Sequence, residues 1–203
     1  LYNYLLFHTL IELSGVIIAF SIFVIGWNTR KYSQNNMILI LTTGYLAVGY
    51  LDIVHTLSFK GMGVLPQFDS NLPTQFWIAA RYVEVAAVFL GAFYLKKKKI
   101  FRSSTWLSVF VGGSILITVA IFGGLFPDSF IEGQGLTRFK VISEYIISAI
   151  FLVAGYLLWQ EKEYIDRKIL RLILLAIGFT VLSELSFTLY IDVYGFFNAL
   201  GHI

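Results

Sequence analysis

Residues 4–27 read YLLFHTLIELSGVIIAFSIFVIGW, an apolar run interrupted by a single acid, Glu12. A helix needs roughly 20 mainly apolar residues to cross the hydrocarbon core of a bilayer. Because the run is continuous, it does not fit the alternating strands of about ten residues that build outer-membrane barrels. The sequence therefore predicts an all-α fold, a polytopic transmembrane helical bundle. Five more such runs follow, at residues 37–59, 74–95, 104–126, 139–159 and 169–190.

The composition excludes several classes of protein. Hydrophobic residues make up 58% of the chain and charged residues only 13%, about half the charged fraction of ordinary soluble domains. The absence of cysteine excludes a disulfide framework, a thiolate metal cluster and a cysteine nucleophile. The net charge of +3 comes from short gaps between apolar runs, so we expect no nucleic-acid binding. No HExxH, GxSxG, Walker or dinucleotide-binding motif is present, so we do not expect an enzyme.

The gaps between the runs differ in their content of lysine and arginine. The first, third and fifth gaps, with their immediate flanks, hold eleven of these residues, including Lys96–Lys99. The second and fourth hold only Lys60, Arg138 and Lys140. Basic loops stay on the cytoplasmic side of a membrane, so we expect the N-terminus to lie outside.

The end of the sequence predicts a further span. After the sixth run, residues 191–194 should turn at the outer surface, and residues 195–203 should re-enter the membrane. We therefore expect one transmembrane domain over residues 1–203, with six complete helices and the start of a seventh that is truncated at residue 203.

Nine ionisable residues lie inside the predicted spans, where each charge is costly and is by default a functional hypothesis. All nine are predicted to lie in the outer half of the membrane, and none lies in the fourth span, which we expect to be peripheral. Spacings of three or four residues place several of them on shared helix faces, and Trp77 extends one of these faces. The pattern predicts an outward-half polar pocket; the alternative is a structural network of hydrogen bonds between helices. The nine residues are His8, Glu12, Asp52, His55, Arg81, Glu84, Glu144, Glu184 and His202.

The three histidines, His8, His55 and His202, are predicted at similar depth. Imidazole nitrogens bind zinc, copper and non-haem iron, so a shared metal ion is one interpretation, with Glu12 and Asp52 as outer acceptors that orient the rings. Two facing histidines holding a haem is a second interpretation. A third is that the histidines only bond to carboxylates and form a proton-responsive switch near neutral pH.

Several motifs together resemble the third class of bacterial membrane-associated sensor domains. They are FHTLIEL at 7–13, IGWNTRKY at 25–32, YLDIVHTLSFKGMG at 50–63, LPTQFWIAARYVE at 72–84 and SELSFTLYIDVYGFFNALGHI at 183–203. In that family the domain is an N-terminal membrane input unit, followed in the cytoplasm by PAS, histidine-kinase, diguanylate-cyclase or phosphodiesterase modules. The motif residues that the resemblance carries over are His8, Glu12, Asp52, His55, Trp77, Arg81, Glu84, Glu184, Asn198 and His202, whereas Glu144 is selected by depth alone.

The resemblance implies the sensory input domain of a bacterial signal-transduction receptor, in a two-component or cyclic-di-GMP system, in the cytoplasmic (inner) membrane. Such a domain binds a small ligand or cofactor and relays the event through the seventh helix to a fused cytoplasmic signalling module. We expect a homodimer by analogy. The alternatives are a small transporter or proton-coupled carrier, and an intramembrane enzyme. Carriers usually have repeated halves and midplane sites, and the sequence shows no repeat, which favours the receptor.

Overall fold

The computed structural model describes residues 3–33, 35–97, 102–188 and 201. Within these ranges the chain forms six long helices, each long and apolar enough to cross a membrane. The predicted all-α bundle is confirmed, and the chain is a multi-pass membrane protein. The helices are α1 (Tyr4–Ser33), α2 (Asn36–Ser58), α3 (Asn71–Tyr94), α4 (Ser103–Phe122), α5 (Arg138–Gln160) and α6 (Arg167–Phe187).

Polar side chains in the gaps set several helix boundaries. The side chains of Asn35, Thr137 and Asp166 accept hydrogen bonds from the first free backbone N–H groups of α2, α5 and α6. The first helix is longer than the apolar run predicts, because polar residues continue it. Asn28 and Thr29 bond to backbone carbonyls one turn earlier, at 2.7 and 2.8 Å, and so remain helical.

A short hairpin, which the sequence does not predict, lies between α4 and α5. It consists of β1 (Phe130–Ile131) and β2 (Gly135–Leu136), which pair antiparallel. The Asn71 side chain accepts hydrogen bonds from the backbone N–H groups of Ser129 and Phe130, at 2.8 and 3.1 Å. The first residue of α3 therefore fixes the hairpin over that end of the bundle.

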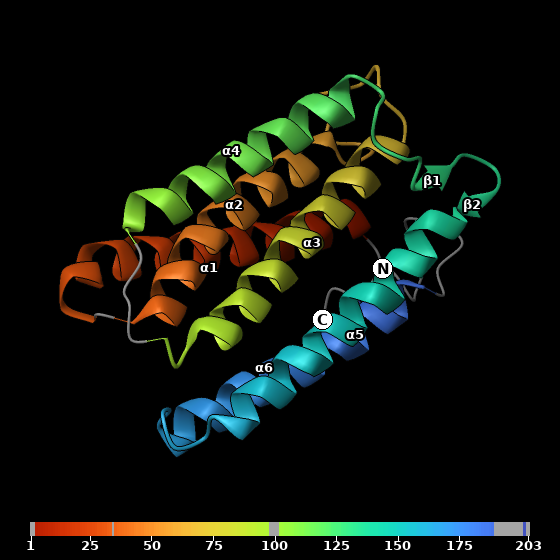
Figure 1. The fold of residues 1–203 in the computed structure, drawn as a ribbon. Coiled ribbons are helices and arrows are strands. Elements are labelled where there is room, and N and C mark those ends of the chain that lie inside the picture. Colours follow the sequence, from red (N-terminus) through yellow and green to blue (C-terminus); the bar gives the residue numbers. More distant parts are fainter. Residues whose placement is uncertain (1–2, 34, 98–101, 189–200, 202–203) are drawn as a thin grey trace.

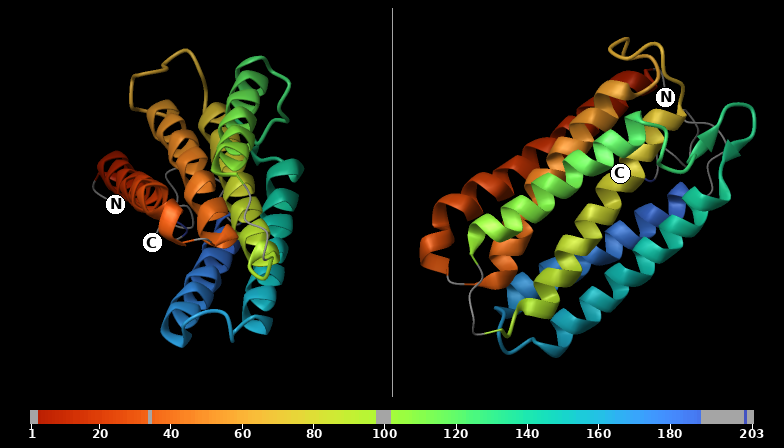
Figure 2. Two further views of the ribbon diagram at one scale, coloured as in Figure 1. Left: turned by 60° about the vertical axis from the view of Figure 1, so that its left-hand side comes forward. Right: turned by 45° about the horizontal axis from the view of Figure 1, so that its top comes forward.

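The helices form a curved row in the order α1, α2, α3, α5 and α6, with α4 against the side of α2 and α3 (Figures 1 and 2). The central helices α2 and α3 are the most buried, whereas α4 buries only Phe110, Ser114 and Ile121. The predicted peripheral position of the fourth helix is confirmed. Large apolar side chains on α1, α4 and α6 point away from the bundle, as lipid contact requires.

Candidate functional site

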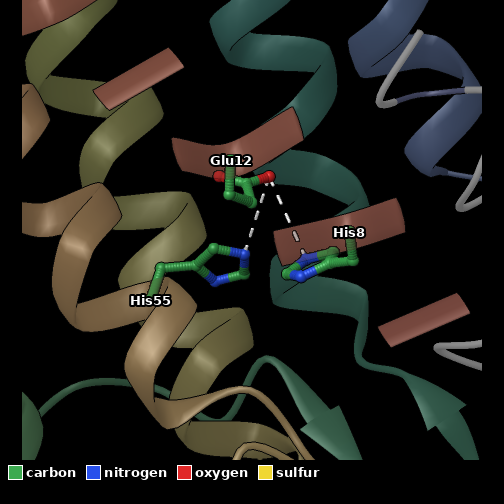
Figure 3. A group of neighbouring side chains, drawn as sticks. All are labelled: His8, Glu12 and His55. Carbon is green, nitrogen blue, oxygen red and sulfur yellow. Dashed lines mark ion pairs between the residues drawn. The ribbon is translucent and has the colours of Figure 1, made fainter. Parts of the chain in front are cut away.

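Two histidines and one carboxylate converge between α1 and α2 (Figure 3). His8 and Glu12 lie one turn apart on α1, and His55 lies near the end of α2. The Nε2 atoms of His8 and of His55 are each 4.0 Å from Oε1 of Glu12. All three side chains are buried, so the sequence-predicted residues of two helices share one enclosed space.

The imidazole rings are held by neighbouring groups. Nδ1 of His55 lies 2.8 Å from the carbonyl oxygen of Pro73, in the first turn of α3. Because a carbonyl only accepts, this nitrogen carries the proton, and Nε2 faces Glu12. The His8 ring stacks on Phe59 with centroids 3.7 Å apart, and the His55 ring lies 5.4 Å from that of Trp77.

A chain of charged side chains links α2 to α3. Nη2 of Arg81 donates to both carboxylate oxygens of Asp52, at 3.0 and 3.1 Å, and Nη1 donates to Glu84 at 2.5 Å. The hydroxyl of Tyr45 donates to the same Glu84 at 3.0 Å. Asp52 therefore pairs with Arg81 instead of orienting His55, a role that the Pro73 carbonyl fills.

A cavity of about 600 Å³ opens between α1 and α6, with α2 and α3 at its floor. Its lining combines ionisable groups with an indole ring, and the guanidinium of Arg81 lies 4.7 Å from the centroid of that ring. Five of the sequence-predicted residues from four helices therefore border one space. They are Glu12, Asp52, Trp77, Arg81 and Glu184.

The first turns of α5 hold a buried ion pair, of which the sequence predicts only the acid, Glu144. Lys140 was assigned to an exterior gap, but it is fully buried and donates to Glu144, one turn along α5. Its ammonium also lies 5.4 Å from the ring of Phe187 on α6. The signal was available in the sequence, because Lys140 and Glu144 have the same four-residue spacing as His8 and Glu12. Among its described residues, the lining of the cavity does not include Glu144.

Residues 1–203 match the sequence pattern of MASE3, a membrane-associated sensor domain, along the whole chain. The chain belongs to the MASE3 family. The resemblance inferred from the motifs is confirmed, and the chain is a membrane-associated sensor domain. No curated protein and no solved structure matches the chain.

The described spans of the MASE3 domain contain more buried acids than bases. Four carboxylates are buried against one ammonium, that of Lys140, whereas Glu84 and Arg81 are partly buried; both Arg81 and Lys140 already bond to carboxylates. A site of this composition favours a positively charged ligand, or protons, over an anion. The acids are Glu12, Asp52, Glu84, Glu144 and Glu184.

The connection between α2 and α3 lies over the histidines of the MASE3 domain. The hydroxyl of Thr9 on α1 lies 3.4 Å from the sulfur of Met62 in this connection, and Phe59 begins it against His8. The segment therefore covers the end of the α1–α2 interface. Two further predicted site residues, Asn198 and His202, lie outside the described residues.

Proposed function

We propose that this MASE3 domain is the sensory input domain of a bacterial signal-transduction receptor in the cytoplasmic membrane. It binds a small ligand in the cavity between α1 and α6 and relays binding through the seventh helix to a fused cytoplasmic signalling module. The observation that carries the proposal is the cavity itself, bordered by ionisable residues of four membrane helices. Charged groups inside a membrane are costly and are usually retained for a ligand, an ion or a proton.

The charge of the site supports a cationic ligand. Arg81 is the only described cation that lines the cavity, and it already bonds to Asp52 and Glu84. An anionic ligand would have to compete with these two carboxylates for the same guanidinium. A cation would instead enter a lining whose described carboxylates, on Glu12, Asp52 and Glu184, outnumber its one described cation.

A series of close contacts supports the relay. Trp77 lines the cavity, and its ring lies 4.7 Å from that of Phe187 at the end of α6. Gly201 approaches α6 so closely that a Cβ atom there would lie 2.6 Å from the Phe187 ring, and its carbonyl accepts a bond from Ser183. A ligand that binds one arrangement tenfold more tightly shifts the equilibrium by about 1.4 kcal/mol.

The first test uses the receptor as its gene encodes it. The sequence that follows Ile203 in the full-length gene should encode a kinase or cyclic-dinucleotide module, and a stop codon directly after Ile203 would contradict the relay. In membranes, Glu184→Gln should change the output of that module, because it alters the charge of the cavity with little change of shape. Glu132→Gln, in the exposed hairpin turn, is the matched control and should leave the output unchanged.

A second pair of variants tests the relay separately from ligand binding. Gly201→Ala places a methyl group against Phe187 and should shift the basal output, whereas Gly178→Ala has open space around its Cβ position and should not. Equal effects of the two substitutions would contradict a relay through this contact.

The orientation of the domain follows from the basic loops and is tested by labelling. A cysteine at position 97 should be protected from an impermeant external reagent in intact cells, and a cysteine at position 132 should react. The reverse pattern would place the cavity on the cytoplasmic side. Crosslinking in the same membranes tests the homodimer that we expect by analogy with receptors of this type.

A carrier remains the rival class for a protein of this size. Carriers typically bind their substrates where membrane helices are broken near the midplane. Each of the six described spans is a continuous helix, and the His8–Glu12–His55 group lies within three turns of a helix end. Both observations favour a receptor.

A further inference from the structure

We propose that His8, Glu12 and His55 bind one divalent first-row transition-metal ion. This inference goes beyond the proposed function: the ion would lie beside the cavity, and Glu12 belongs to both sites. One donor atom from each of the three residues lies within 4.8 Å of the other two, and all three residues are buried. In a tetrahedral zinc site with bonds of 2.0–2.1 Å, neighbouring donors lie about 3.3 Å apart. The two pairs that include Glu12 must close from 4.0 Å, and the pair of histidines from at most 4.8 Å, so each donor must move inward by about half an ångström.

The hydrogen bond of His55 prepares its ring for ligation. Metal-binding histidines usually donate their second ring N–H to a carbonyl or carboxylate, which fixes the tautomer and the orientation of the ring. Nδ1 of His55 makes such a bond to the Pro73 carbonyl, at 2.8 Å. The lone pair of Nε2 is thereby directed toward Oε1 of Glu12, and toward the space that the three residues share (Figure 3).

An aromatic ring packs against each of the two proposed histidine ligands. Phe59 stacks on His8 at a centroid distance of 3.7 Å, and Trp77 packs against His55. Only 7% or less of the surface of each of the three proposed ligands is exposed. The three side chains are therefore largely shielded from water and are held close to one another before an ion binds.

The donor set and its charge select the kind of ion. Two imidazole nitrogens with one carboxylate oxygen are the ligands of many zinc enzymes and of non-haem iron sites, whereas magnesium and calcium prefer oxygen alone. A divalent ion bound to two neutral imidazoles and Glu12 leaves one net positive charge, which offsets part of the excess of buried acids. Three protein donors also leave a coordination position open, and Glu12 borders the cavity as well.

The geometry favours a single ion over a haem held by the same two histidines. An axially bound haem lies in the plane midway between the two ligating nitrogens. Oε1 of Glu12 is equally distant, at 4.0 Å, from Nε2 of His8 and Nε2 of His55, so it lies on that plane. The macrocycle would have to displace this buried carboxylate.

Metal titration of the purified protein tests the proposal. The protein, stripped with a chelator, is titrated in detergent with Co²⁺, and its visible absorption is followed before displacement by Zn²⁺. We expect saturation near one ion per chain. His8→Gln, His55→Gln and Glu12→Gln should each lower the affinity by more than about 100-fold, which exceeds the effect of losing an outer-shell partner. Thr9→Val, beside His8 on α1, and Glu132→Gln are the controls and should bind as the parent does.

A measurement on the parent protein avoids any dependence on the folding of the variants. X-ray absorption at the zinc edge should show nitrogen and oxygen donors at about 2.0–2.1 Å, with the outer scattering of two imidazoles. Binding without imidazole scattering, or no stoichiometric binding, overturns the metal site.

A failure of the metal site can be distinguished from a failure of the proposed sensory function. If Glu184→Gln changes the receptor output but no ion binds, the domain is a sensor without this metal, and a proton-responsive histidine pair becomes the better account. If an ion binds and neither its removal nor Glu184→Gln alters the output, the metal site stands and the sensory role of the cavity fails.

Discussion

The helices α2 and α3 pack against each other along their length, but their two halves do so by different means. Toward Ser58 and Asn71, the contact includes two hydrogen bonds from Nη2 of Arg81 to Asp52, beside an apolar cluster that contains Leu51 and Phe76. Toward Asn36 and Tyr94, the contact is apolar and close: a Cβ atom on Gly44 would lie 2.4 Å from that of Ala87. We call these the polar half and the close-packed half.

The difference shows how one helix pair meets two requirements. Small residues let membrane helices approach closely, and van der Waals contact then holds them together without a hydrophobic driving force. In the polar half, the long side chains of Asp52 and Arg81 bridge the two helices. The free energy needed to remove these charges from water offsets much of the attraction between them. The close-packed half therefore fixes the distance between α2 and α3, whereas the polar half supplies side chains that line the cavity.

The largest effect should come from leaving buried charges unmatched in the polar half. Arg81→Met removes the partner of both Asp52 and Glu84, and should lower the free energy of unfolding by about 3–5 kcal/mol. Reversible unfolding in mixed detergent micelles measures this loss. The double variant Arg81→Met with Asp52→Asn should recover part of it. A loss below about 1 kcal/mol for Arg81→Met would show that the ion pairs are solvated as surface pairs are.

In the close-packed half, the effect should come from volume instead of charge. Gly44→Ala forces its new methyl group against Ala87, and overpacking of this kind lowers stability by about 1–3 kcal/mol. The double variant Gly44→Ala with Ala87→Gly restores the space and should unfold as the parent does. Gly112→Ala on α4, where a Cβ meets open space, is the control and should be neutral or slightly stabilising. Failure of the swap to restore stability would contradict contact at this pair.

Most of the fold was predictable from apolar runs, because length and continuity alone decide whether a segment can span a bilayer. The boundaries were less accurate where polar side chains bond back to the helix, as Asn28 does at the end of α1. The hairpin was not predicted, because it depends on a contact between Asn71 and residues far along the chain.

The residues of the candidate site, and the pairs that lie on one helix, could be predicted from spacing, but the pairs between helices could not. Spacing along one helix identified His8 with Glu12, and depth brought in His55. The pairing of Asp52 with Arg81, and of His55 with a backbone carbonyl, depends on how α2 and α3 are placed, which spacing does not report. Tyr45 escaped notice because its ring counts as apolar, although its hydroxyl bonds to Glu84.

Tyr45 lies where the two halves meet and should have an intermediate effect. Tyr45→Phe removes the hydroxyl that donates to Glu84, and should lower the free energy of unfolding by about 0.5–1.5 kcal/mol. Tyr50→Phe, which loses a bond of 3.2 Å to the neutral Thr118, is the matched control and should lose less. Equal losses would mean that the charge of Glu84 does not strengthen its hydrogen bond with Tyr45.

The smallest effect should come from a charge pair outside the helix bundle. Nζ of Lys60 lies 2.7 Å from Oε1 of Glu132, but the two side chains are 52% and 50% exposed. Exposed pairs contribute about 0–1 kcal/mol and are screened by salt, whose Debye length falls to about 3 Å at 1 M. A double-mutant cycle of Lys60→Gln and Glu132→Gln should therefore give a coupling below about 1 kcal/mol that disappears in 1 M salt. The same cycle on Asp52 and Arg81, with Asn and Gln, should keep its coupling in salt, because the polar half excludes the ions that screen the surface pair.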